Sequence, residues 1–163
     1  MAPLTFIYVR HGKPRKPIDD SDAANRAKPL NNKGRSDAVT AGEWLASQGI
    51  VPDLVVHTRT VRTEETAALI QEVLGTSHEP LVVSGGFPQG ADAGDIDQYI
   101  NWWERQAGRP VRTILFVGHH TQQIALLREL GGPRPADKAR GVVLTYTVDD
   151  DGKWRVGPCH PGQ

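Results

Sequence analysis

Three short polar segments of this 163-residue chain carry side chains that could do chemistry: the triplet Arg10-His11-Gly12, and two later segments that contain Arg62 and His119. A guanidinium group stays charged at any working pH, and its planar fork of donors matches the oxygens of a phosphoryl group. A neutral imidazole is a competent nucleophile near pH 7. The two arginines could therefore hold phosphoryl oxygens while His11 attacks phosphorus, with a protonated His119 donating from the opposite side.

These residues can share one pocket if the chain folds as alternating strands and helices, and its hydrophobic periodicity predicts such a fold. Apolar runs rich in β-branched residues predict four strands, at Leu4–Val9, Asp53–Val56, Leu81–Val83 and Thr113–Val117. Helical spacing predicts helices from Gly34 to a stop at Gly49, and over Thr60–Leu74, Asp95–Gln106 and Gln122–Leu130. The C-terminal runs 142–148 and 154–156 predict a hairpin at the edge of the sheet.

Each polar segment directly follows a predicted strand. In open α/β sheets, ligands bind outside the carboxyl ends of the strands, near the point where strand order reverses. Residues far apart in the sequence would meet there. Gly12 and Gly118 would give the backbone room beside a ligand.

Composition limits the class of protein. The chain is 38% apolar and 23% charged, with a formal net charge of zero, which is typical of one globular domain over residues 1–163. Cys159 is the sole cysteine, which excludes an internal disulfide and argues against a cysteine zinc site. No apolar run reaches membrane-span length and the N-terminus does not read as a signal peptide, so we expect a cytoplasmic protein without membrane contact.

Positive charge is concentrated near the triplet. Residues 10–35 hold eight Arg or Lys and three Asp, an excess of 8 − 3 = +5. Part of this segment, 13–29, is predicted to be a long loop. The segment would suit an anion, and the alternative is a solvated basic loop. Aromatic residues are not interleaved with the charges, so we do not expect nucleic acid as a partner.

The segment Tyr8-Val9-Arg10-His11-Gly12 resembles the signature of the histidine phosphatase superfamily, the phosphoglycerate mutase-like proteins. The likeness runs almost end to end and is strongest to the small SixA-type phosphohistidine phosphatases. It includes Lys28–Asn31, Asp53–Thr66 and Val117-Gly118-His119. The resemblance implies a three-layer sandwich with a mostly parallel sheet, His11 as the phosphorylated residue, and Arg10, Arg62 and His119 as the phosphate pocket. It implies no metal and no cofactor.

The sequence departs from this family at one segment. His57-Thr58-Arg59 stands where the family usually has Ser-Ser-Pro. The hydroxyl of Thr58 can replace that of serine. We expect His57 and Arg59 to face solvent, although either could instead add charge near the pocket.

The proton donor for the leaving group is the least defined part of the predicted site. Asp92 lies in the loop where larger members of the family place a carboxylate, and as a general acid it would need a raised pKa. The alternative is a turn aspartate. Asp95 is expected to be the N-cap of the following helix.

Three functions remain open from the sequence. The first is a phosphatase acting on phosphohistidine in a protein or, alternatively, on many small phosphomonoesters. The second is a metal-dependent hydrolase with His11, His57 and His119 as ligands, although the spacing lacks a usual metal motif. The third is a phosphate-binding module without turnover.

Overall fold

A computed structural model describes residues 3–163 of the chain. The strands are β1 (Leu4–Arg10), β2 (Leu54–Thr58), β3 (Leu81–Val83), β4 (Thr113–Gly118), β5 (Val143–Val148) and β6 (Trp154–Val156). The helices are α1 (Asp22–Arg26), α2 (Asn32–Ser47), α3 (Val61–Leu74), α4 (Ala93–Ala107) and α5 (His120–Leu130). The six strands form one sheet in the order β3-β2-β4-β1-β5-β6.

The sheet is mostly parallel, as predicted. Strands β3, β2, β4 and β1 run parallel to one another, whereas β5 is antiparallel to β1, and β6 to β5. The strand order reverses at β4 and β1. The chain passes from β1 to β2 on one side of this pair, and from β4 to β5 on the other. The predicted C-terminal hairpin is β5 and β6, and it forms one edge of the sheet.

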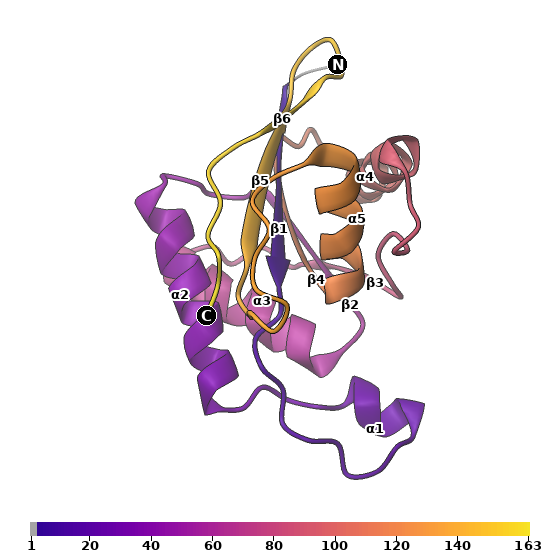
Figure 1. The fold of residues 1–163 in the computed structure, drawn as a ribbon. Helices are drawn as coiled ribbons and strands as arrows, with labels where there is room; N and C mark the ends of the chain where they lie inside the picture. The colour runs from indigo at the N-terminus through magenta and orange to yellow at the C-terminus, as the bar shows by residue number, and fades with distance from the viewer. Residues whose placement is uncertain (1–2) are drawn as a thin grey trace.

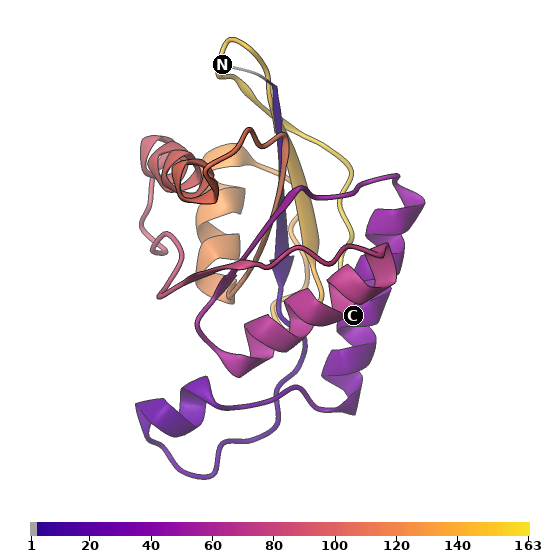
Figure 2. The ribbon, with the colours of Figure 1, turned by 180° about the vertical axis from the view of Figure 1, so that it is seen from behind.

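Helices cover both faces of the sheet and make three layers (Figures 1 and 2). Alternating residues of β1 divide between two cores: Phe6 and Tyr8 pack with α4 and α5, while Ile7 and Val9 pack with α2 and α3. All four side chains are fully buried. A strand buried on both faces reads as a continuous apolar run, which is why β1 could be predicted from sequence.

Several predicted boundaries differ from the structure; α4 begins at Ala93 rather than Asp95, and α5 at His120 rather than Gln122. The segment 13–29 is not loop throughout, because it contains the short helix α1, whose N-cap Ser21 accepts a hydrogen bond from the Ala24 backbone. Helix α2 begins at Asn32 rather than Gly34, because the Asn31 side chain caps it by accepting a 2.8 Å hydrogen bond from the Gly34 backbone.

Within residues 3–163, no helix is both long and apolar enough to cross a bilayer.

Candidate active site

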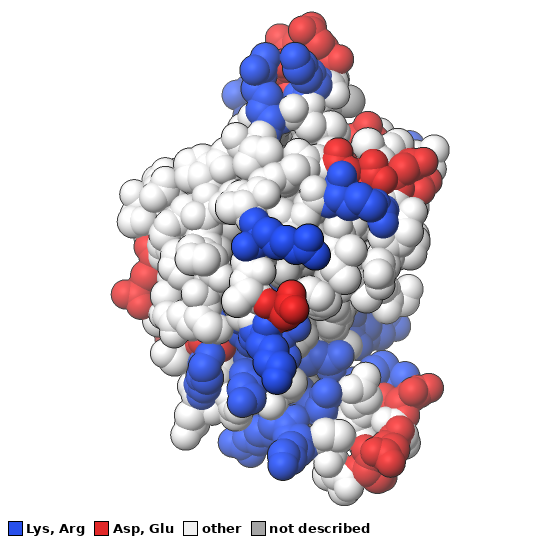
Figure 3. Space-filling model, in the orientation of Figure 1, with Lys and Arg blue, Asp and Glu red and all other residues white. Residues whose placement is uncertain are grey.

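The carboxyl ends of β1, β2 and β4 meet at one end of the sheet, as the sequence predicted. The register pairs Arg10 with Gly118, and His57 with Val117, so the three polar segments leave neighbouring strands at the same level. In Figure 1 this is the lower end, toward which the arrowhead of β1 points. Figure 3 shows Lys and Arg side chains gathered over that end of the visible face.

His11 is held in one orientation directly after β1. Its Nδ1 lies 2.7 Å from the carbonyl oxygen of Gly12, which can only accept, so Nδ1 carries the hydrogen and Nε2 has a free lone pair when the ring is neutral. The side chain is buried. Burial lowers its pKa well below 6.5, and the nearby groups His119, Arg62 and Arg140 lower it further. His11 is therefore neutral at pH 7.

The turn after His11 requires glycine. A Cβ on Gly12 would lie 2.2 Å from the carbonyl oxygen of Gly34, and a Cβ on Gly34 would lie 2.2 Å from that of Lys13. The two backbones therefore touch. Thr66 fixes the same turn, since its hydroxyl accepts a 3.1 Å hydrogen bond from the Gly12 backbone and donates one of 2.7 Å to the Arg62 carbonyl.

His119 faces His11 from the end of β4, with 5.2 Å between ring centroids. Its Nε2 lies 2.7 Å from the hydroxyl of Thr58, and this hydroxyl donates to that of Thr63 at 3.0 Å. Because the Thr58 hydrogen is used by Thr63, Nε2 of His119 is the donor to Thr58. The Tyr8 hydroxyl donates a 2.7 Å hydrogen bond to the His119 carbonyl and positions its backbone.

Burial and positive charge also set the protonation of His119. Burial lowers its pKa to about 4, with further lowering by Arg62, Arg10 and Lys28. The ring is therefore neutral at pH 7 in the ligand-free protein, which corrects our expectation of a protonated donor. A bound dianion would offset the cations and raise this pKa.

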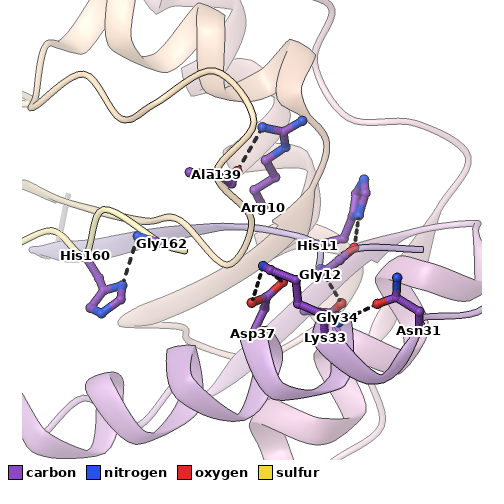
Figure 4. Close-up of polar contacts among 11 residues, drawn as sticks. Arg10, His11, Gly12, Asn31, Lys33, Gly34, Asp37, Ala139, His160 and Gly162 are labelled. Carbon is purple, nitrogen blue, oxygen red and sulfur yellow. Dashed lines mark hydrogen bonds and ion pairs between the residues drawn. The ribbon is translucent and has the colours of Figure 1, made fainter. Parts of the chain in front are cut away.

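The two predicted arginines are both buried near these rings. Arg10 donates from Nη1 to the carbonyl oxygens of Asp137, at 3.0 Å, and Ala139, at 2.9 Å. Figure 4 shows Arg10 reaching the Ala139 segment while the ring of His11 stands beside the Gly12 carbonyl. Arg62, in the first turn of α3, donates from Nη1 to the Asn25 carbonyl in α1 at 2.7 Å.

Two cations that the sequence reasoning did not assign to the site, Lys28 and Arg140, affect it electrostatically. Partial burial lowers the pKa of Lys28, and so do the charges of Arg62 and Arg140. Arg140 also lowers the pKa of His11. Lys28 belongs to Lys28–Asn31, one of the segments that carry the family resemblance, whereas no pattern marks Arg140, which lies in an irregular segment. Thr66 and Tyr8 were likewise not singled out for their contacts.

The side chain of Asp92 is hydrogen-bonded to Asp95 and to none of the pocket residues described above. It is exposed and is the N-cap of α4, accepting a 2.8 Å hydrogen bond from the Asp95 backbone, while the Asp95 carboxylate accepts one from the Asp92 backbone. The carbonyl oxygen of the preceding residue, Ala91, accepts a hydrogen bond from Arg128 in α5. Arg128 lies about 12 Å along the helix axis from His120, the first residue of α5. The predicted N-cap, Asp95, was therefore wrong, and the geometry gives no support to Asp92 as a general acid.

His57 and Arg59 have different surroundings. Arg59 is exposed, as expected, but His57 is 5% exposed, so the expectation that it faces solvent was wrong. Alternation along β2 places Thr58 toward His119 and His57 on the opposite face. There His57 lines a pocket of about 460 Å³ between α3 and β3.

The histidines do not form a metal site. Within residues 3–163, His, Cys, Asp and Glu side chains are not gathered in any group of three or more that could hold a metal ion. The ligand set of His11, His57 and His119 considered from the sequence is thus not assembled.

Comparisons with known proteins agree with this geometry. Residues 6–85, which span β1 to the segment after β3, match the model of the histidine phosphatase superfamily, branch 1. The chain is similar to a 2,3-bisphosphoglycerate-dependent phosphoglycerate mutase of Bartonella quintana, with 29% identity over 107 residues. That match covers 63% of this chain and 52% of the mutase, so it spans about half the length of the relative.

Solved structures match over nearly the whole chain. The structure of the protein histidine phosphatase SixA complexed with tungstate has a TM-score of 0.72 at 20% identity, covering 97% of each chain. A putative phosphohistidine phosphatase SixA from Agrobacterium tumefaciens has a TM-score of 0.69 at 17% identity, covering 96% of this chain and 97% of that one. At these identities the likeness establishes the fold, and the expected three-layer, phosphoglycerate mutase-like architecture is confirmed.

Proposed function

Because this chain belongs to the histidine phosphatase superfamily, we propose that it is a phosphatase in which His11 carries the phosphoryl group from substrate to water. The observation that carries the proposal is that His11 faces His119 and lies among the positive charges of Arg62 and Arg140. The hydrogen bond from Nδ1 of His11 to the Gly12 carbonyl adds to it. This bond fixes the ring, and burial keeps the ring neutral at pH 7. A neutral imidazole with a free Nε2 is the form that attacks phosphorus.

In the first step, the Nε2 lone pair of His11 forms a bond to phosphorus, and the bond from phosphorus to the leaving group breaks with its electron pair. Arg10 and Arg62 hold phosphoryl oxygens as charge redistributes over them. The dianion raises the pKa of His119, so the ring can take up a proton and place its positive charge beside the phosphoryl oxygens while Nε2 stays bonded to Thr58.

In the second step, water attacks phosphorus and the P–N bond breaks. The electron pair returns to Nε2 of His11, and the proton lost by water leaves with phosphate or solvent. The products are inorganic phosphate and the neutral imidazole with which the cycle began.

The preferred substrate is phosphohistidine on a protein. A phosphorylated imidazole that is protonated on its other ring nitrogen departs as neutral imidazole, so this leaving group needs no strong acid from the enzyme. The exposed capping role of Asp92 fits a reaction of that kind. The similar fold of a protein histidine phosphatase supports the same substrate class.

A broad phosphomonoesterase is the second candidate, and the similarity to a phosphoglycerate mutase favours it. Initial rates on a phosphohistidine protein, a sugar phosphate and an aryl phosphate distinguish the two. We expect the phosphohistidine protein to give the highest kcat/KM. Equal slow rates on all three would overturn this substrate assignment, and the absence of turnover with measurable phosphate binding would instead identify a binding module.

The proposed reaction uses side chains alone. Activity should therefore survive dialysis against EDTA and should not rise when zinc or magnesium is restored. Loss with EDTA and recovery with zinc would contradict the mechanism.

A further inference from the structure

Arg140, in the segment between α5 and β5, has a guanidinium group whose hydrogen-bonding needs are not met. Its Nε and Nη1 atoms are buried and have no partner among residues 3–163. A buried charged donor without an acceptor costs more than an unmet neutral one, since it loses water and gains nothing in exchange. An oxyanion that enters beside Arg140 would supply the acceptors.

The backbone holds Arg140 next to the triplet that contains His11. The following residue, Gly141, donates a 3.2 Å hydrogen bond to the Arg10 carbonyl, and the Arg140 backbone exchanges two hydrogen bonds of 3.0 Å with Gln163. Gly141 has a φ of 67°, and a Cβ there would lie 2.9 Å from the Asp37 carbonyl oxygen. The position of Arg140 is therefore fixed by the fold and does not depend on a free loop.

Arg10 has an unmet donor at the same place. Its Nη1 is used by the carbonyl oxygens of Asp137 and Ala139, whereas its Nε is buried without a partner among the described residues. Two guanidinium groups on adjoining backbone segments thus present three buried nitrogen atoms that lack acceptors. The charge of Asp37 raises the pKa of Arg140 and so offsets part of the effect of burial, but its carboxylate is hydrogen-bonded to Lys33 at 3.1 Å and does not pair with Arg140.

The charge of Arg140 also reaches the other members of the site. It lowers the pKa values of His11, Arg10, Arg62 and Lys28, in each case after burial. Each of these groups is therefore near enough to Arg140 to respond to its charge. Positive charges gathered without acceptors between them indicate a site for an anion.

We infer that Arg140 is a third arginine of the phosphoryl site, and that its guanidinium group donates from one of these unpaired nitrogen atoms to an oxygen of the bound phosphoryl group. This inference deepens the proposed function and rests on it for the identity of the ligand. A planar guanidinium group suits an oxyanion better than an ammonium group does, because its N–H bonds point in fixed directions and it stays charged at any working pH.

The test measures inorganic phosphate binding by isothermal titration calorimetry at pH 7.5. Arg140→Gln should weaken phosphate binding about tenfold or more, which corresponds to about 1.4 kcal/mol. Arg140→Lys should recover part of the loss, since it restores charge without the fork. The matched control is Lys138→Gln, which removes the same charge from an exposed position in the same segment. Equal affinities in Arg140→Gln and Lys138→Gln would overturn the inference.

Thermal unfolding separates binding from a merely structural role. Since its buried donors are unpaired, Arg140→Gln should unfold at the wild-type temperature or above it in phosphate-free buffer, and it should gain less from added phosphate. A variant that unfolds much earlier without phosphate would show that Arg140 supports the fold instead.

The outcomes also distinguish this inference from the proposed function. If hydrolysis depends on His11 while Arg140→Gln binds phosphate like the wild type, the function stands and the role of Arg140 is wrong. If no substrate turns over while phosphate binding depends on Arg140, the proposed phosphatase function is wrong and the anion site at Arg140 stands.

Discussion

Two buried histidines lie at the carboxyl ends of the parallel strands β1 and β2, which flank β4, and they are held in the same way. Nδ1 of His11 lies 2.7 Å from the carbonyl oxygen of the next residue, Gly12, and Nδ1 of His57 lies 2.8 Å from that of Thr58. Both side chains are under 10% exposed. A hydrogen bond from the ring to the next carbonyl therefore does not distinguish the proposed nucleophile, His11, from His57.

The surroundings of the two rings differ. His11 faces His119, and the nearby Arg62 and Arg140 impose positive charge on it. The pocket of His57 contains two arginines and two glutamates, so its formal charges cancel; they are Arg26, Arg59, Glu64 and Glu79. The comparison indicates that an excess of oxyanion donors around the ring, rather than its burial or tautomer, defines the phosphoryl site.

The largest expected effect separates the two histidines directly. His11→Ala should lower kcat by at least about 10⁴-fold, because it removes the atom that accepts the phosphoryl group. His57→Ala should stay within about threefold of the wild type. Steady-state hydrolysis of a phosphohistidine protein measures both. Equal losses in the two variants would place the chemistry outside the pocket described here.

The next effect compares the arginines near each ring. Arg62→Gln should lower kcat/KM by about 10²- to 10³-fold, since it removes a donor from the charge that develops on the phosphoryl oxygens. Arg59→Gln, which changes an exposed residue of the His57 pocket, should lower it by less than about threefold. An Arg59 effect as large as that of Arg62 would move the site toward β3.

A third effect appears in stability. Burial lowers the pKa of His119 from 6.5 to about 4, so below pH 6.5 the unfolded chain binds a proton that the folded protein does not. The free energy of unfolding should therefore fall as pH drops from about 6.5 to 4, with a contribution from His119 of up to about 3 kcal/mol. Urea unfolding at several pH values should show a shallower dependence for His119→Gln. An unchanged dependence would contradict the buried, cation-surrounded ring.

The smallest effect concerns Asp92. Asp92→Ala should lower the free energy of unfolding by about 1 kcal/mol through the lost cap of α4, and Asp92→Ser should restore most of it. Neither variant should change kcat on phosphohistidine by more than about twofold. A tenfold drop in kcat for both would return Asp92 to the role of general acid.

Much of the site could be predicted because it depends on strand ends. The apolar run Leu4–Val9 marks a doubly buried strand, and the polar triplet that interrupts it has to lie at the carboxyl end of that strand. The same logic located Arg62 and His119. Positions next to regular elements inherit their location from hydrophobic periodicity, which a single sequence displays.

Residues in irregular segments could not be placed in this way. Arg140 reaches the site through the pairing of Gly141 with Arg10, a contact between positions about 130 residues apart that no local pattern encodes. Asp92 was considered as a general acid because of the loop in which it lies. In the structure, Asp92 and Asp95 form a capping box at the start of α4, and both carboxylates accept hydrogen bonds there. His57 was expected in solvent because the second strand was predicted to end at Val56, whereas β2 continues to Thr58 and is buried throughout.

The central claim, that His11 rather than any other histidine takes the phosphoryl group, can be measured by trapping the intermediate. Rapid acid-free quenching during turnover of a ³²P-labelled phosphohistidine protein, followed by peptide mass spectrometry, locates the phosphoryl group on the enzyme. We predict an acid-labile, base-stable label on His11 in the wild type and in His57→Ala, and none in His11→Ala. A label on His57 or His119, or rapid turnover by His11→Ala, would contradict the account.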